Sequence, residues 1–224
     1  MHKHIPNFLT CCNLVCGCVG IIFLLEGRHT PVAYFVWAAC IFDFFDGFAA
    51  RLLKISSPIG KELDSLADMV SFGVLPSLFM YTMLAFESPF SNLPYIALLI
   101  ALCSALRLAI FNLDETQSDS FKGLPTPANA LFITAIPFLE SPVFDVVHSP
   151  VVLCCISIIF SMLLVSRIDL FALKFKNFRW PENKIRFTFL ALAVLLLAVL
   201  QWAALPLIIL LYIALSLGVR VFSK

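Results

Sequence analysis

The stretch from Asp43 to Asp68 holds the residues of this sequence that are best suited to chemistry. It reads DFFDGFAARLLKISSPIGKELDSLAD, with four aspartates, at positions 43, 46, 64 and 68, inside otherwise strongly apolar sequence. A charged side chain at the centre of a membrane helix costs about 2.5–3.5 kcal/mol on insertion scales, so four such acids need compensating partners. Cations are the obvious candidates.

The spacing of the aspartates indicates one shared pocket. On a helix, Asp43 and Asp46 are three residues apart and Asp64 and Asp68 are four apart, so each pair projects from one helix face. The pairs lie on consecutive antiparallel helices, and Asp43 precedes the end of its helix by about ten residues, or ~15 Å. We therefore expect both pairs to meet in a pocket that opens to the cytoplasm.

Four converging carboxylates without histidine or cysteine form an all-oxygen site, which suits Mg²⁺ or Mn²⁺ rather than zinc. Two such ions would neutralise the acids, clamp a diphosphate and stabilise the charge that develops as a phosphoryl oxygen leaves. Gly47, Ala50 and Gly60 would leave room for a bulky ligand to approach the backbone. Arg51 would offer a guanidinium group to a phosphate.

Two other interpretations of the acidic cluster stay open. The first is a set of interhelical salt bridges, but only Arg51 and Arg107 lie in the membrane region to answer four acids. The second is a path for cations through the membrane, as in a divalent-cation transporter, because acids within a membrane often line one. Against a transporter, no acid recurs on the outer half of any expected helix.

The composition is that of a polytopic membrane protein. Of the 224 residues, 61% are apolar and 13% are charged, with a formal net charge of +1. No soluble domain of this size needs so many apolar residues to fill its core. The eight cysteines form no C-x-x-C pair and no cluster with histidine, so we expect them to be packing residues.

Apolar runs predict an all-α protein with about eight transmembrane helices, since ~20 apolar residues cross a ~30 Å hydrocarbon core. Lysine and arginine prefer cytoplasmic loops, and placing both termini in the cytoplasm leaves Arg28 as the only basic residue outside. We therefore expect both termini to be cytoplasmic. The expected spans are 7–25, 31–53, 63–85, 94–112, a short span from 127, 151–165, 185–200 and 205–222.

The basic run from Arg167 to Arg186 has two interpretations. It is a cytoplasmic loop that fixes topology, which we favour, or a contact with anionic membrane lipids, worth about 1 kcal/mol for each charge. Nothing in the run predicts a nucleic-acid partner.

The aspartates and their neighbours also form a recognisable motif. The signature of the CDP-alcohol phosphotransferase family is matched at all eight specified positions by Asp43-x2-Asp46-Gly47-x2-Ala50-Arg51-x8-Gly60-x3-Asp64-x3-Asp68. The chain thus resembles a family of integral membrane enzymes that move a phosphatidyl or related group from a CDP-linked donor to an alcohol. The resemblance also implies a six-helix core, two Mg²⁺ or Mn²⁺ ions and a homodimer.

The resemblance assigns a role to each matching residue. It makes Asp43, Asp46 and Asp64 metal ligands, and Asp68 both a metal ligand and the general base. It places Thr10 and Asn13 at the headgroup of the CDP-linked lipid, although both residues could instead only pack the first helix through hydrogen bonds. The residues that it places around the CDP moiety and its phosphates are Gly47, Ala50, Arg51 and Gly60.

Three further stretches resemble the bacterial and archaeal family members that use serine as the alcohol. They are residues 5–14, 105–112 and 121–128, with Ile110 at a position where those members often carry an arginine. The carboxylate of serine needs a cation and its ammonium needs oxygen acceptors. We expect Arg107, Asn112 and Lys122 to meet these needs, while Arg107 as a topogenic charge and Asn112 as a helix cap remain alternatives.

The resemblance therefore implies one membrane-embedded catalytic domain over residues 1–224, with a family core of about 1–166 and a two-helix extension of about 185–222. Its expected reaction transfers the phosphatidyl group of CDP-diacylglycerol to L-serine and releases CMP. A member that uses glycerol 3-phosphate is the nearest alternative. We expect the chain in the inner, cytoplasmic membrane, surrounded by membrane lipids, with its active site facing the cytoplasm.

Overall fold

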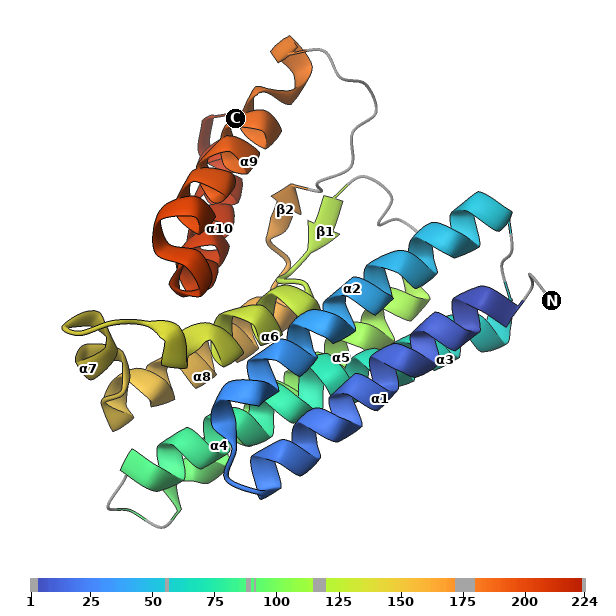
Figure 1. Ribbon diagram of the computed structural model, residues 1–224. Coiled ribbons are helices and arrows are strands. Elements are labelled where there is room, and N and C mark those ends of the chain that lie inside the picture. Colours follow the sequence, from blue (N-terminus) through green and yellow to red (C-terminus); the bar gives the residue numbers. More distant parts are fainter. Residues whose placement is uncertain are drawn as a thin grey trace.

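The computed structural model describes residues 4–54, 57–87, 90, 92–114, 120–171 and 180–222 as a bundle of apolar helices (Figure 1). The first four helical stretches pack side by side. They are α1 (Ile5–Leu25), α2 (His29–Leu53), a continuous run of α3 (Pro58–Asp68), the π-helical segment Met69–Val74 and α4 (Leu75–Glu87), and α5 (Leu98–Leu113) preceded by the 3₁₀ turn Leu93–Ala97.

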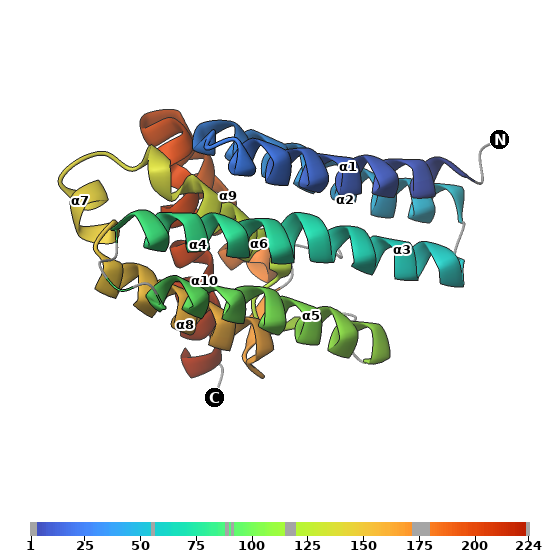
Figure 2. The same cartoon turned by 90° about the horizontal axis from the view of Figure 1, so that it is seen from below.

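The second half of the chain adds shorter helices and a terminal hairpin, which consists of the last two helices, α9 (Trp180–Leu200) and α10 (Ala204–Phe222). The hairpin crosses the other helices at a steep inclination rather than running parallel to them (Figures 1 and 2). The other elements are α6 (Thr126–Ala135) with the 3₁₀ turn Ile136–Phe138, α7 (Val143–Val147), α8 (Pro150–Val165), and the 3₁₀ turn Gln201–Ala203 between α9 and α10.

Five helical stretches of the described chain are long and apolar enough to cross a membrane. They are Ile5–Leu25, His29–Leu53, Pro58–Glu87, Leu93–Leu113 and Asn183–Gly218. The last stretch includes most of both α9 and α10, and the apolar helices Thr126–Phe138 and Pro150–Val165 are shorter than spanning length. Each predicted span thus coincides with a helix. The predicted all-α, multi-pass membrane fold is confirmed, and the cytoplasmic placement of both termini stays a prediction.

The third span begins at Pro58, earlier than the predicted position 63, because the sequence before it caps a helix. Ser57 is extended, and its Oγ accepts a hydrogen bond from the backbone N–H of Gly60 at 3.0 Å. Pro58 occupies the first helical turn, where its missing N–H costs nothing. The Ser-Pro pair therefore starts α3, whereas α2 has already ended at Leu53 with Lys54 as its cap.

A two-stranded antiparallel ribbon lies outside the helical pattern, and nothing in the sequence pattern predicts it. Strand β1 (Ser120–Lys122) pairs with β2 (Asp169–Phe171), with Phe121 opposite Leu170. The terminal hairpin packs against this ribbon, since Tyr212 of α10 donates a hydrogen bond from its hydroxyl to the carbonyl of Phe171 at 3.0 Å. The ribbon thereby links the segments that follow α5 and α8 to the last helix.

Two glycines allow α1 to approach the third span very closely. A Cβ atom on Gly17 would lie 2.9 Å from Cα of Ser71, and one on Gly20 would lie 2.6 Å from Cδ2 of Leu75. Small residues at such contacts let membrane helices pack backbone to backbone. The contact at Gly17 holds α1 beside the π-helical segment that directly follows Asp68.

Replacing Gly17 by alanine should therefore destabilise the bundle, because the added methyl group would meet the backbone of Ser71. We expect a loss of about 1–3 kcal/mol, the usual cost of an overpacked contact. The midpoint of thermal unfolding in detergent measures the loss. Gly218→Ala is the matched control, since nothing lies within 4 Å of a Cβ atom there. Equal midpoints for the two variants would contradict the packing argument.

Candidate active site

Three of the four motif aspartates meet between α2 and α3. Asp43 from α2 and Asp64 and Asp68 from α3 each offer a carboxylate oxygen, and these three oxygens lie within 4.8 Å of one another. Asp68 is 8% exposed, whereas Asp43 and Asp64 are half-buried. The helical spacing and the antiparallel pairing of the two helices thus bring these acids together. We name Asp43, Asp64 and Asp68 the acidic cluster.

Asp46 lies about one turn further along α2 and is not a member of the three-oxygen group. Its Oδ2 accepts a hydrogen bond from Oγ1 of Thr10 at 2.7 Å, so it is turned toward α1. Asp46 nevertheless borders the same region, because it lines a cavity together with Asp64.

A second hydrogen bond from α1 reaches the acidic cluster. Nδ2 of Asn13 donates to Oδ1 of Asp68 at 3.0 Å, and Asn13 is fully buried. Thr10 is almost as deeply buried, with 3% of its surface exposed. The two residues predicted to contact the lipid headgroup therefore each contact one aspartate of the motif.

The donor set of the acidic cluster fits a divalent cation. In the part of the chain that the structure describes, no lysine, arginine or histidine forms an ion pair with the acidic cluster. The ion pairs found there include Arg28–Glu26, Lys122–Asp114 and His148–Glu87. Oδ1 of Asp64 is also buried without a hydrogen-bond partner. Carboxylate oxygens are the ligands that Mg²⁺ prefers, and a cation would offset their mutual repulsion. Asp43, Asp64 and Asp68 could thus hold a metal ion.

A cavity of about 230 Å³ opens beside Asp64, and we name it the Asp46 cavity. Four of the six residues predicted around the CDP-linked lipid line it, namely Thr10, Gly47, Ala50 and Gly60. The full lining is Pro6, Asn7, Thr10, Asp46, Gly47, Ala50, Ser57, Gly60, Lys61 and Asp64.

Arg51 is exposed and folds back along α2 over Gly47. A Cβ atom on Gly47 would lie 3.3 Å from Nη1 of Arg51, closer than most real contacts of a Cβ atom. Gly47 therefore makes room for the guanidinium group of Arg51 as well as for a ligand. Because Gly47 lines the Asp46 cavity, this position brings a cation to the cavity wall.

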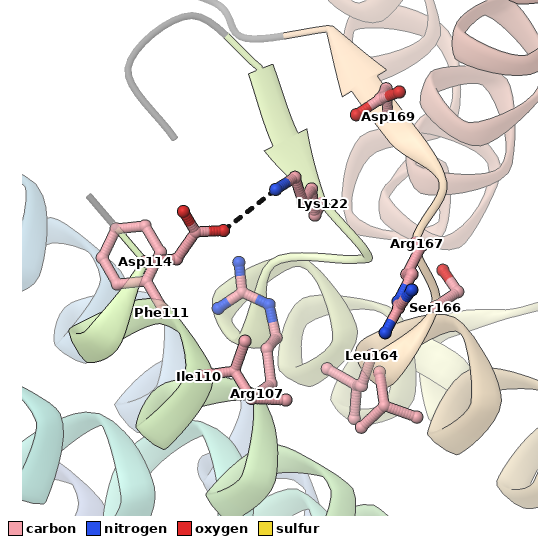
Figure 3. Close-up of a pocket in the computed structure, with 10 residues that line it drawn as sticks. Arg107, Ile110, Phe111, Asp114, Lys122, Leu164, Ser166, Arg167 and Asp169 are labelled. Atoms are coloured by element: carbon pink, nitrogen blue, oxygen red, sulfur yellow. Dashed lines mark hydrogen bonds and ion pairs between the residues drawn. The ribbon is translucent and has the colours of Figure 1, made fainter. Parts of the chain in front are cut away.

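A larger cavity, of about 510 Å³, lies between the end of α5, β1 and the segment that joins α8 to β2 (Figure 3). We name it the Arg107 cavity. Two of the residues predicted to bind serine, Arg107 and Lys122, line it. The full lining is Arg107, Ile110, Phe111, Asp114, Lys122, Leu164, Val165, Ser166, Arg167 and Asp169.

Three cations surround the Arg107 cavity. Arg107 is 8% exposed, and its Nε has no hydrogen-bond partner. Lys122 forms an ion pair with Asp114 at 3.0 Å. Figure 3 shows Arg107 and Arg167 coming from opposite walls. The cavity can therefore accept an anionic group.

The structure does not bring Asn112 to this cavity. Nδ2 of Asn112 donates to Oγ of Ser65 at 2.8 Å. The backbone carbonyl of Asn112 accepts a hydrogen bond from Nζ of Lys61 at 2.6 Å. Asn112 thus ties α5 to α3, away from Arg107.

Sequence reasoning missed Arg167, which the structure places in the wall of the Arg107 cavity. The sequence pattern indicated a topogenic charge there or a contact with anionic lipids. A usable signal was Gly123, because a glycine in this position indicates a turn after Lys122. In the structure its φ is 78°, a conformation that favours glycine. Its N–H donates to the carbonyl of Ile168 at 2.9 Å, which brings the strand that carries Lys122 beside Arg167.

The model of the CDP-alcohol phosphatidyltransferase family matches residues 3–163. The chain belongs to this family. The matched region contains the acidic cluster, the whole lining of the Asp46 cavity, and Arg107 and Lys122 of the Arg107 cavity. The family recognised from the aspartate motif is therefore confirmed.

Several curated relatives carry the name CDP-diacylglycerol–serine O-phosphatidyltransferase. One from Bacillus subtilis is 36% identical over 141 residues, which are 63% of this chain and 79% of that protein. One from Methanocaldococcus jannaschii is 34% identical over 165 residues, or 73% of this chain and 72% of that protein. One from Helicobacter pylori is 35% identical over 138 residues, but the match spans only 58% of that protein.

Removing one carboxylate of the acidic cluster should weaken metal binding. We expect Asp64→Asn to raise the dissociation constant for Mn²⁺ at least about tenfold, because even outer-shell partners of a metal usually contribute that much. The electron paramagnetic resonance signal of free Mn²⁺ measures binding without turnover. Asp114→Asn is the control, since Asp114 pairs with Lys122 outside the cluster. Unchanged Mn²⁺ affinity in the Asp64 variant would remove Asp64 from the ligand set.

Proposed function

We propose that this chain transfers the phosphatidyl group of CDP-diacylglycerol to the hydroxyl group of L-serine and releases CMP. The supporting observation is that the acidic cluster is connected to two cavities of different character. Asp64 belongs to the cluster and lines the Asp46 cavity. Asp68 belongs to the cluster, and its helix α3 is tied through Ser65 to Asn112 of α5. Helix α5 also carries Arg107 of the other cavity. A donor and an acceptor could therefore meet at the same carboxylates.

The comparisons support serine as the acceptor. The relatives from B. subtilis, M. jannaschii and H. pylori all carry a name that includes serine, at 34–36% identity. Four residues predicted to surround the CDP-linked lipid line the same cavity, which supports the placement of the CDP moiety there. They are Thr10, Gly47, Ala50 and Gly60.

The donor would lie with its diphosphate at the Asp46 cavity. Gly47, Ala50 and Gly60 leave the backbone accessible, and Arg51 beside Gly47 can bind a phosphate oxygen. Two divalent cations, Mg²⁺ or Mn²⁺, held by Asp43, Asp46, Asp64 and Asp68, would neutralise the diphosphate and the oxygen of the leaving CMP. The acyl chains would extend between the helices into the surrounding lipid.

The acceptor would lie in the Arg107 cavity. Arg107, Lys122 and Arg167 can bind the serine carboxylate, and the carboxylates of Asp114 and Asp169 can accept hydrogen bonds from its ammonium group. Asp68 would take the proton from the serine hydroxyl as general base. The serine oxygen then forms a bond to the lipid-linked phosphorus, and the bond from that phosphorus to CMP breaks.

We also propose the domain division, oligomer and location that the family resemblance implies. The family model ends at residue 163, which supports a core of about 1–166 and an extension of about 185–222. Arg51, Arg107, Lys122 and Arg167 lie near the proposed site, and this basic character supports a cytoplasmic active site in the inner membrane. The homodimer rests on the resemblance.

A phosphate-bearing acceptor such as glycerol 3-phosphate is the second candidate. The observation that favours it is that two guanidinium groups, of Arg107 and Arg167, line the cavity beside the Lys122–Asp114 ion pair, since guanidinium suits a phosphate. A competition between the two alcohols decides which acceptor the cavity prefers.

Purified protein with CDP-diacylglycerol and Mn²⁺ should release CMP when serine is added, and glycerol 3-phosphate should not replace serine. Asp68→Asn should abolish this release while the helical fold is retained, because the amide cannot accept the hydroxyl proton. Chromatographic detection of CMP measures the reaction, and circular dichroism checks the fold. Failure to release CMP with any alcohol, together with metal flux in vesicles, would favour a cation transporter instead.

Replacing Arg167 should weaken acceptor binding more than it slows the chemical step. We expect Arg167→Gln to raise the KM for serine about tenfold, since a charge-assisted hydrogen bond is worth about 1.5–3 kcal/mol and Arg167 is exposed. The kcat should change little. Arg28→Gln is the control, because Arg28 pairs with Glu26 between α1 and α2, away from both cavities. An unchanged KM would exclude Arg167 from the acceptor site.

A further inference from the structure

We propose that Asn13 is a positioning residue that holds the carboxylate of Asp68. Its Nδ2 donates to Oδ1 of Asp68 and thereby fixes the plane of the carboxylate, so that Asp68 can both hold a metal ion and take the proton of the acceptor hydroxyl. The inference rests on the proposed function, because it takes Asp68 as the general base. It replaces both roles expected for Asn13, which were contact with the lipid headgroup and simple packing of the first helix.

The contact between Asn13 and Asp68 is short and rigidly supported. The Nδ2–Oδ1 distance is 3.0 Å, and the Asn13 side chain is fully buried. Oγ of Ser71 donates a hydrogen bond to the backbone carbonyl of Asn13 at 2.9 Å, and the contact of Gly17 with Ser71 lies one turn further along α1. The backbone of Asn13 is therefore fixed against the third span at Ser71, which is only three residues after Asp68.

The orientation of the Asn13 amide follows from the charge of Asp68. Rotating the amide by half a turn would place its oxygen against the carboxylate oxygen, where both atoms carry negative charge. Nδ2 therefore faces Asp68, and this fixes Oδ1 on the opposite side of the amide. Oδ1 is buried there without a hydrogen-bond partner.

This unpartnered oxygen argues against a purely structural role. A buried acceptor without a donor costs stability, and an apolar side chain of the same shape would avoid that cost. Leucine has nearly the shape of asparagine and would fill the same space. The feature that asparagine adds is its donor to Asp68. The amide therefore serves the carboxylate rather than the packing of α1.

The place of Asn13 also differs from that of a residue that contacts the lipid headgroup. Thr10, one turn earlier, lines the Asp46 cavity, whereas Asn13 does not. Thr10 has one hydroxyl proton and two acceptors within reach, Oδ2 of Asp46 at 2.7 Å and the carbonyl of Pro6 at 3.0 Å. The carboxylate is the stronger acceptor. Thus α1 supplies one hydrogen-bond donor to α2 and one to α3, but of the two residues only Thr10 also lines the Asp46 cavity.

Asn13→Leu tests the inference, because it removes the donor and retains the shape. We expect kcat to fall about 100-fold, the usual result when a reacting group is misplaced by ~1 Å. The KM values for CDP-diacylglycerol and serine should stay within about threefold. The midpoint of thermal unfolding should change little, because removal of the unpartnered Oδ1 of Asn13 offsets the lost hydrogen bond to Asp68. Asn13→Asp keeps the shape but places a second carboxyl group against Asp68, where the two groups repel each other or share one proton, so it should lose as much kcat.

Thr134→Val is the matched control. Thr134 is fully buried, and its hydroxyl donates to the carbonyl of Ala130 within its own helix at 2.8 Å. The substitution also replaces a buried polar side chain by an apolar one of the same shape, and kcat should remain as in the unaltered protein. Equilibrium binding of CDP-diacylglycerol without serine gives a further comparison that does not depend on turnover.

Two results would overturn the inference and leave the proposed function intact. One is weaker binding of CDP-diacylglycerol by Asn13→Leu with an unchanged kcat, which would make Asn13 a contact of the donor. The other is a fall in kcat accompanied by a large fall in the unfolding midpoint in both Asn13 variants, which would make it structural. Absence of CMP release by the unaltered protein would instead refute the proposed function itself.

Discussion

The structure depends on keeping three mutually repelling carboxylates together inside apolar helices. Asp43, Asp64 and Asp68 bring their oxygens within 4.8 Å of one another, and like charges repel most strongly where water is scarce. A bound cation would offset this repulsion, and α1 contributes one hydrogen bond to Asp68. That hydrogen bond forms only because Gly17 lets α1 touch the backbone of the third span. The close packing at Gly17 and the hydrogen bond from Asn13 to Asp68 therefore depend on each other.

The third span changes its winding at the point where its acidic face ends. The π-helical segment Met69–Val74 begins directly after Asp68, and α4 continues from it to Glu87. A π-helical turn contains more residues than an α-helical turn, so it rotates the faces of the helix that follow it. The aspartates upstream can thus face α1 and α2, while the residues downstream, such as Phe79, pack fully buried in the apolar core.

Local patterns predicted what depends on helical spacing, and tertiary contacts determined the rest. All four motif aspartates were predicted to meet, because spacings of three and four residues fix a helix face. The three members of the acidic cluster do meet, whereas Asp46 accepts a hydrogen bond from Thr10. Arg167 was not placed in a cavity, because its position depends on the pairing of two short strands that are about fifty residues apart. Asn112 was grouped with Arg107 by sequence distance, but the hydrogen bond to Ser65 turns it toward α3. Periodicity carries no information on such contacts.

The β1–β2 ribbon forms part of the wall of the Arg107 cavity but carries none of the acidic cluster. The carboxylates lie on α2 and α3, whereas Arg167 and Asp169 lie on or next to the ribbon, which is braced by Tyr212 of the terminal hairpin. Substitutions in the ribbon or the hairpin can therefore reshape the larger cavity while the acidic helices stay unchanged. The wall of the larger cavity and the acidic cluster thus belong to separate structural units, so a change in one leaves the framework of the other in place.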